Sequence, residues 1–96
     1  MTRILWSPQA LHDLEAVRDY VAVDSPRYAD LVLERIVRAV ERLRDFPQSG
    51  RIVPERNDPS LREIIVRPYR VVYRLRGDQA EVVTVFRASR QFPAVP

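Results

Sequence analysis

The sequence predicts an α+β fold, β-α-α-β-β-β, in which a helical hairpin packs on one face of a mostly antiparallel sheet. Two stretches with a helical apolar period occupy the first half of the chain, and three short runs rich in β-branched and aromatic residues lie between residues 61 and 90. Helices and strands that are segregated along a chain are typical of α+β folds. A chain of 96 residues is long enough for one hydrophobic core, so we expect residues 1–96 to form a single domain.

The first strand and the first helix are predicted at the N-terminus. Residues 3–6, RILW, form a short apolar run that favours a strand. Ser7-Pro8 indicates a helix start, because a serine side chain can cap the first turn and proline lacks the N–H that would stay unpaired there. From Pro8 to about Val23 the apolar residues fall on one helical face, with Asp13 among the polar residues of the other. That apolar face comprises Ala10, Leu14, Val17 and Val21.

The second helix is predicted to begin in the same way. Ser25-Pro26 repeats the start signal, and the helical period continues to about Asp45, just before Phe46-Pro47. Its apolar stripe comprises Ala29, Val32, Leu33, Ile36, Val40 and Leu43. Because only a short break separates the two helices, we expect an antiparallel hairpin. The segment that follows, residues 48–60, holds a glycine, two prolines and mixed charges, and this composition indicates a loop that crosses back to the sheet.

A β-hairpin is predicted around Gly77-Asp78. Apolar and polar residues alternate from Tyr69 to Arg76, as in a half-buried strand, so we expect Tyr69 and Tyr73 to face the core and arginines to line the opposite face of the sheet. A two-residue turn at Gly77-Asp78 also predicts the strand pairing. The predicted pairs are Arg74 with Glu81, Tyr73 with Val82, Val72 with Val83, Arg70 with Val85, and Tyr69 with Phe86.

Composition excludes several classes of protein. There is no cysteine, so neither disulfides nor thiolate chemistry are available, and the single histidine, His12, together with scattered carboxylates gives no metal-ligand spacing. We therefore expect no metal and no cofactor. No apolar run approaches the roughly 20 residues of a membrane span. The N-terminus lacks a basic-then-apolar signal region, so the cytoplasm is the expected location.

The positive charge of the chain lies in its second half. All 16 basic residues are arginines. Residues 46–96 carry nine arginines against five acids, or +4, whereas residues 1–45 carry seven against eight, or −1, which gives the net charge of +3. Arginine binds carboxylate and phosphate bidentately, which favours recognition of a specific anionic partner. The candidate residues for contact with a partner or target are Arg51, Arg62, Arg67, Arg70, Arg74, Arg87 and Arg90. The alternative is an ordinary solvated strand face with internal ion pairs, such as Arg74 with Glu81, and with Arg51 tying its loop to the sheet.

Four segments together resemble the RelE/ParE superfamily, the toxins of bacterial type II toxin–antitoxin pairs, and in particular its ParE, or plasmid-stabilisation, branch. They are WSPQALHDLEAVRDYV, FPQSGR, LREIIVRPYRVVYRL and VFRASR, and they span nearly the whole chain in order. The resemblance implies the strand–helix–helix–three-strand fold. It also implies an antitoxin that wraps the toxin, and a target that is either DNA gyrase or mRNA on the ribosome.

The chemistry available on this chain favours the gyrase branch. RNA cleavage through the 2′-hydroxyl needs a general base and a general acid beside cations. RelE-like nucleases place a histidine or tyrosine near the C-terminus, whereas this chain has Arg87 where the family often has histidine, and arginine stays protonated at working pH. If the chain were a nuclease, its candidate catalytic residues would be Arg62, Arg70, Arg87 and Glu55. Otherwise Glu55 is a solvated loop carboxylate, and the catalytic set is empty.

Three functions therefore follow as hypotheses. The first is a toxin that inhibits gyrase by binding and causes growth arrest, and the second is a RelE-like ribosome-dependent mRNA endoribonuclease. The third, a plain nucleic-acid-binding module, has less support because both helices are amphipathic toward a core and the net charge is modest. For the first two we expect a cognate antitoxin with an acidic amphipathic segment, assembled with the toxin as a hetero-oligomer, and DNA contact only through the antitoxin.

Overall fold

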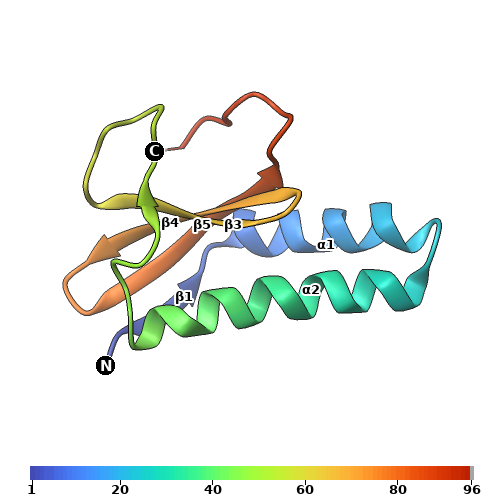
Figure 1. Cartoon of the computed structure of the whole chain (residues 1–96), viewed down its shortest axis with the longest axis horizontal. Coiled ribbons are helices and arrows are strands. Elements are labelled where there is room, and N and C mark those ends of the chain that lie inside the picture. The colour runs from blue at the N-terminus through green and yellow to red at the C-terminus, as the bar shows by residue number, and fades with distance from the viewer. Residues whose placement is uncertain (96) are drawn as a thin grey trace.

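A five-stranded sheet carries two helices on one of its faces, and a loop and the C-terminal tail lie on the other (Figure 1). The structure, a computed structural model, describes residues 1–95; the last residue of the predicted tail, Pro96, lies outside this range. The elements in chain order are β1 (Arg3–Trp6), α1 (Pro8–Ala22), α2 (Pro26–Glu41), the 3-10 turn η1 (Arg42–Arg44), β2 (Arg51–Ile52), β3 (Leu61–Val66), β4 (Tyr69–Arg76) and β5 (Gln79–Arg87). The predicted α+β class is confirmed.

The sheet is antiparallel except at one pair of strands. Its order is β1-β5-β4-β3-β2, and β1 pairs with β5 in parallel. The two helices connect β1, at one edge of the sheet, to β2 at the opposite edge. The prediction missed β2, because two residues flanked by loop are too short to show a strand period.

Both helices begin where the serine–proline pairs predict. The Ser7 hydroxyl accepts a hydrogen bond from the Ala10 backbone N–H at 3.0 Å, and Ser25 does the same for Tyr28 at 3.1 Å. The predicted end of the second helix, at about Asp45, is wrong: α2 ends at Glu41 and η1 continues the chain to Arg44. A tighter turn at a helix C-terminus is common, because the last carbonyls can bond in the 3-10 pattern there.

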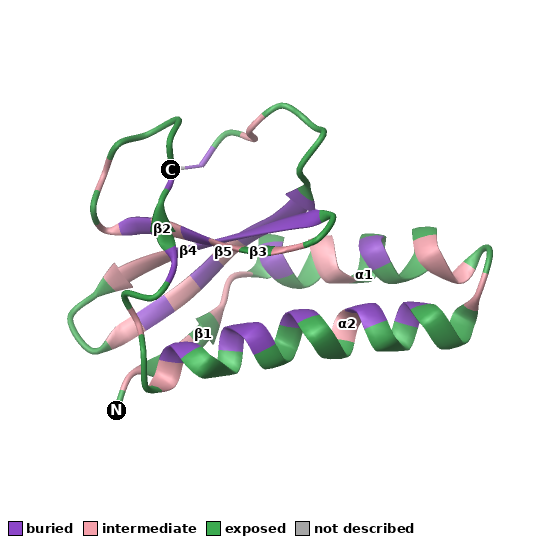
Figure 2. Cartoon of the chain, viewed as in Figure 1, coloured by how far each residue is buried: buried purple, intermediate pink, exposed green. Residues whose placement is uncertain are grey.

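The main core lies between the helices and the sheet, where the buried residues of both layers face one another (Figure 2). Both predicted helical stripes contribute to it, together with the predicted inward face of β4. Its fully buried members include Ile36, Val40, Leu43, Val71, Tyr73 and Val82. Burial of such side chains stabilises the fold by about 1.5–3 kcal/mol each relative to exposure.

The β4–β5 hairpin turns at Gly77-Asp78 as predicted, and Gly77 adopts a left-handed φ of 55°. Arg74 lies opposite Glu81 and Tyr73 opposite Val82, also as predicted. Beyond that point the predicted pairing is wrong by one residue, since a β-bulge interrupts the register next to Val72. The observed pairs are Val72 with Thr84, Arg70 with Phe86, and Tyr69 with Arg87.

Asp13, which the sequence places on the polar side of the first helix, contacts β5 beside the altered register. From the half-buried face of α1 its Oδ2 accepts hydrogen bonds from the Thr84 hydroxyl at 2.6 Å and from the Val85 N–H at 2.9 Å. A bulge leaves backbone groups without a cross-strand partner. The carboxylate supplies one, and no local sequence pattern records a contact between residues so far apart.

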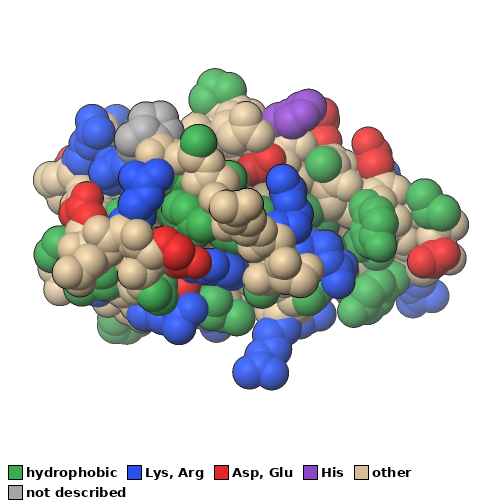
Figure 3. All heavy atoms as spheres, turned by 90° about the horizontal axis from the view of Figure 1, so that it is seen from above, with side chains coloured by type: hydrophobic (Ala, Val, Ile, Leu, Met, Phe, Trp, Pro, Cys, Tyr) green, Lys and Arg blue, Asp and Glu red, His purple; other side chains and the backbone are tan. Residues whose placement is uncertain are grey.

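The prediction that arginines line the other face of the sheet is wrong in part. A second, smaller cluster lies there, formed by Val53, Leu61, Val72, Phe86 and Val95, with Val83 and Phe92 packed against it. The loop from residue 53 to residue 60 and the C-terminal tail cover this face (Figure 1). Seen from that side, acidic and basic side chains are interspersed over the surface (Figure 3).

Gly50 lets the chain pass close to the core between η1 and β2. Its N–H donates to the Tyr73 hydroxyl at 3.0 Å, and that hydroxyl donates in turn to the Pro47 carbonyl at 2.7 Å. A Cβ at this position would lie 2.6 Å from both the Glu63 carbonyl oxygen and the Tyr73 hydroxyl oxygen. Tyr73 is thus a core residue that also holds the FPQSGR segment against the sheet.

Candidate functional site

Arg70 is the centre of the charged groups on the sheet face opposite the helices. It is buried in β4, and its Nε donates to Glu63 at 2.6 Å. Its two terminal nitrogens donate to the two carboxylate oxygens of Glu55 at 2.8 and 2.7 Å. The guanidinium also lies 5.2 Å from the ring centroid of Phe86 and 5.3 Å from that of Phe92. Each of its three nitrogens therefore donates to a partner within this chain.

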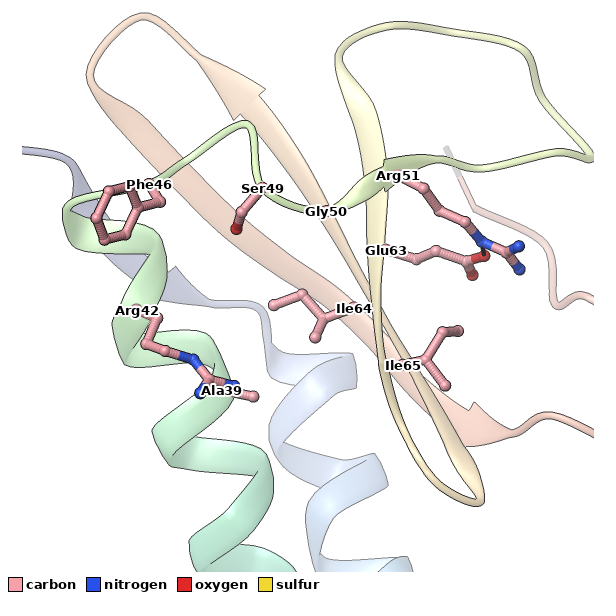
Figure 4. A pocket seen from close by; sticks show the side chains of 9 residues that line it. All are labelled: Ala39, Arg42, Phe46, Ser49, Gly50, Arg51, Glu63, Ile64 and Ile65. Atoms are coloured by element: carbon pink, nitrogen blue, oxygen red, sulfur yellow. Dashed lines mark hydrogen bonds and ion pairs between the residues drawn. The ribbon is translucent and has the colours of Figure 1, made fainter.

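Glu63 is the buried anion of this cluster. Its side chain is fully buried, and its second oxygen accepts from Arg51 Nε at 2.6 Å (Figure 4). Arg51 and Glu63 are cross-strand neighbours on β2 and β3, so strand pairing brings them together. A buried carboxylate needs such compensation, because an unpaired buried charge is strongly destabilising.

These contacts shift the pKa values of the two partners of the bidentate pair. The hydrogen bonds from Arg70 lower the pKa of Glu55 to about 2, against an ordinary value of 4.5. The same hydrogen bonds, joined by those to Glu63, raise the pKa of Arg70 above its ordinary value. In both cases the partner favours the charged form. Glu55 is consequently ionised and committed to Arg70 at neutral pH.

Arg62 and Arg74 also contact groups of this chain. Arg62 donates to the backbone carbonyls of Pro59 and Gly50 at 3.0 Å and of Gln48 at 3.3 Å, which joins two loops to β3. Arg74 lies 3.7 Å from Asp58, whose pKa is lowered chiefly by hydrogen bonds from Ser60. Four of the seven candidate arginines, Arg51, Arg62, Arg70 and Arg74, therefore hold strands and loops together.

The other three candidate arginines, Arg67, Arg87 and Arg90, are exposed. Arg87, at the end of β5, lies 5.9 Å from the ring centroid of Tyr20 and 6.0 Å from that of Tyr69. Together with Arg90 these side chains border a hollow of ≈ 250 Å³ between α1 and the end of β5. A cation beside exposed aromatic surface can take part in recognition of an anionic or aromatic group.

Sequence reasoning missed two further groups of arginines. Arg56 donates to the Val95 carbonyl at 2.8 Å and lies 5.7 Å from the ring centroid of Phe92, so it fastens the C-terminal tail. Arg35 and Arg38 of α2, with Arg42 at the start of η1, line a hollow beside Arg67 at the edge of the sheet. Their i, i+3, i+7 spacing, which places them on one helical face, is a signal that could have found them.

Within residues 1–95 no cluster of three histidine or acidic side chains could hold a metal ion. His12 is exposed on α1. Neither of the helices in this part of the chain is long and apolar enough to cross a membrane.

The sequence and the fold both match a class of small toxins. The model of the family described as "ParE toxin of type II toxin-antitoxin system, parDE" matches residues 4–92. The chain therefore belongs to the ParE family, within the RelE/ParE superfamily of type II toxins.

Relatives and a solved structure agree with this assignment. The chain is 39% identical to "Putative toxin Y4kP" of Sinorhizobium fredii, over 97% of this chain and 95% of that protein. It is 32% identical to "Toxin RelE2" of Caulobacter vibrioides, over 94% of this chain and 99% of that protein. A solved structure described as "Chromosomal ParDE TA system from P. aeruginosa" is similar with a TM-score of 0.75 at 26% identity, over 91% of this chain and 96% of that one.

Proposed function

We propose that this protein is a type II toxin that arrests growth by binding DNA gyrase, without catalysing a reaction. One observation carries the proposal: the carboxylates next to the central arginine are already paired. Glu63 accepts from Arg51 and Arg70 with its two oxygens, and Glu55 accepts from Arg70 bidentately. Neither carboxylate of the Arg70 cluster is thus available as a proton acceptor.

A nuclease would need such an acceptor near pH 7. Efficient general bases have a pKa near the operating pH, whereas the pKa of Glu55 lies at about 2. The Tyr73 hydroxyl is engaged with Pro47 and Gly50, and burial raises its pKa further. Arg62 and Arg70, which would stabilise a phosphorane, are held by intrachain partners. These contacts favour inhibition by binding.

The same proposal includes an antitoxin partner in the cytoplasm, where gyrase acts. The ParE family and the similar P. aeruginosa structure are both described as parts of a toxin–antitoxin system, which supports a cognate antitoxin for this chain. The exposed arginines, Arg67, Arg87 and Arg90, are the candidates for contact with the antitoxin or the target. Such a pair would stabilise a plasmid or a chromosomal segment that encodes it.

A supercoiling assay tests the target directly. Purified toxin is added to gyrase and relaxed plasmid, and we expect loss of supercoiling together with trapped, cleaved gyrase–DNA complexes. The double variant Arg87→Glu/Arg90→Glu reverses two exposed candidate contact residues, so it should inhibit supercoiling less than the wild type while it melts like the wild type. The matched control Arg27→Glu/Arg76→Glu reverses two exposed arginines elsewhere and should inhibit like the wild type. Unchanged supercoiling at toxin excess over gyrase, with wild-type protein shown to be folded, would refute the proposal.

The second candidate function is cleavage of mRNA on the ribosome. The 32% identity to a protein named "Toxin RelE2" supports it, as does the exposed hollow that contains Arg87 and Tyr20. Translation extracts with a defined mRNA test this candidate, with primer extension as the readout. Codon-positioned cuts that vanish in Arg87→Ala would establish the nuclease and displace the gyrase proposal.

A further inference from the structure

A groove runs between α2 and the outer side of β3; we call it the edge groove. Its helical wall includes Arg35 and Ala39 of α2 and Arg42 of η1. Its sheet wall includes Ile64, Ile65 and Arg67. The part nearest β2 has a volume of ≈ 450 Å³. Figure 4 shows Ile64 pointing toward α2 across this space, with Phe46 just beyond the end of the helix.

The sheet is unpaired along this groove. The Leu61 carbonyl accepts from the Val53 N–H, so the backbone groups of Leu61 point away from β4. Backbone direction alternates with a period of two along a strand, and therefore the N–H and C=O of Ile65 point away from β4 as well. The pairing of β2 with β3 ends at Arg51 and Glu63, and Gly50 then turns away to the Tyr73 hydroxyl. Ile65 thus presents an open strand edge.

The groove is also strongly basic. Arg35, Arg38, Arg42 and Arg67 line its outer part without an acidic residue among the lining side chains. Arg38 is paired with Glu34, whereas within residues 1–95 Arg35, Arg42 and Arg67 have no carboxylate partner. Apolar surface adjoins these charges, since Ile65 is 44% and Phe46 66% exposed. Open edges attract a pairing strand unless they are covered or blunted.

We propose that the edge groove binds an extended acidic segment of a partner protein, which adds a strand to the sheet at β3. The partner's backbone pairs with Ile65, and its carboxylates meet Arg35, Arg42 and Arg67. This proposal rests on the proposed function only for the source of the segment, the antitoxin. Addition of a strand combines main-chain hydrogen bonds with side-chain specificity, and it suits an edge flanked by cations.

Other occupants fit the groove less well. A second copy of this chain would bring its own arginines to the same edge, and like charges would repel. A nucleic acid would satisfy the arginines through its phosphates, but it has no backbone N–H and C=O pattern for Ile65. A peptide with alternating carboxylates and β-branched side chains matches both the charges and the edge.

A binding experiment with a synthetic peptide tests the proposal. The probe is a short fluorescein-labelled peptide of alternating glutamate and valine, and fluorescence anisotropy at low salt measures its affinity for the full chain. We expect saturable binding that weakens as salt rises, because exposed charges are screened. Arg35→Glu/Arg67→Glu should raise Kd about tenfold. The matched control Arg27→Glu/Arg76→Glu changes exposed arginines elsewhere by the same charge and should leave Kd unchanged.

A second pair of variants separates the backbone from the side chain. Ile65→Pro removes the edge N–H without touching a β3–β4 hydrogen bond, and it should raise Kd about fivefold, the equivalent of one hydrogen bond. Ile65→Ala keeps that N–H and should bind more tightly than Ile65→Pro. Should Ile65→Pro fail to fold, amide exchange of the wild type replaces it. Peptide should then protect the Ile65 amide and leave that of Ile4, on the open edge of β1, unchanged.

Three results would overturn the proposal. The first is the absence of saturable binding, and the second is equal binding of a peptide that alternates lysine and valine. The third is that Ile65→Pro binds the peptide as tightly as the wild type or, where that variant does not fold, that the peptide leaves the Ile65 amide unprotected. Tighter binding of a short RNA oligomer, unaffected by Ile65→Pro, would reassign the groove to nucleic acid and overturn it too. If the peptide docks as expected while gyrase is unaffected in the supercoiling assay, the target proposal fails and the docking edge stands.

Discussion

The two faces of the sheet are stabilised by different means. The face toward the helices is covered by apolar side chains such as Ile36, Val40 and Val71, whose burial needs no particular partner. The opposite face combines a small apolar cluster with the buried ions Glu63 and Arg70. Its stability therefore depends on particular hydrogen bonds. The comparison teaches that arginine on a strand can be part of the interior, and that exposure decides which arginines remain for a partner.

The largest expected effect comes from breaking the ion cluster. Arg70→Met would leave Glu63 buried with Arg51 as its only cation, and we expect a loss of about 3–5 kcal/mol in the free energy of unfolding. Urea denaturation measures it. The control Arg76→Met removes an exposed arginine of the same strand and should change stability by less than about 0.5 kcal/mol. Similar small losses in both variants would mean that the second face is held by apolar contacts alone.

A smaller effect is expected where the two faces are joined through Gly50. In Gly50→Ala the new methyl group meets the Glu63 carbonyl and the Tyr73 ring at less than van der Waals distance, which should cost about 1–3 kcal/mol. Thermal denaturation measures the change. At Gly77 the left-handed φ of 55° is the constraint, and an added Cβ would meet no atom of the surroundings within 4 Å. Gly77→Asn should therefore be nearly neutral, because asparagine tolerates a left-handed φ. An unchanged melting temperature for Gly50→Ala would show that the FPQSGR segment moves aside easily.

The C-terminal tail provides the next test. Phe92 packs edge-on against Phe86 with a centroid separation of 5.6 Å and lies beside the guanidinium groups of Arg56 and Arg70. We expect Phe92→Ala to lower stability by about 1–2 kcal/mol, from the loss of one aromatic pair and two cation–π contacts. Phe46→Ala, at a side chain that is 66% exposed, should have little effect in the same denaturation series. Equal effects would indicate that the tail does not cover the sheet in solution.

The smallest effect is a pH dependence of the Glu55–Arg70 pair. Because folding lowers the pKa of Glu55 from 4.5 to about 2, its contribution is complete above pH 4.5 and disappears as the pH falls toward 2. The Glu55 side chain is 42% exposed, so solvent screening limits this contribution to at most about 1 kcal/mol. Glu55→Gln should therefore flatten the acid limb of stability measured between those pH values. An unaltered acid limb in this variant would assign the pH dependence to other carboxylates.

Local sequence patterns predicted both helices and the strands β1, β3, β4 and β5, but not β2. The serine–proline pairs marked both helix starts, and the helical stripes identified the core face. The Gly77-Asp78 turn placed Arg74 opposite Glu81. These features depend on residues that are close together in the chain, so their physics is visible in a short window. The pairing beyond Val72 was not predictable in this way, since a bulge supported by Asp13 of a distant helix decides it.

The candidate site was predictable in composition but not in geometry. The sequence alone determined the α+β class, the use of arginine for every basic residue, and the absence of thiol chemistry, because these follow from residue types and their periods. Only the tertiary structure decided which arginines are engaged. Strand pairing and two covering segments bring Glu55, Glu63 and Phe92 onto Arg70, and they leave Arg35, Arg42 and Arg67 beside an open edge. The physical reason is that the neighbours of a charged side chain decide whether it is paired or available to a partner, and here those neighbours are distant in sequence.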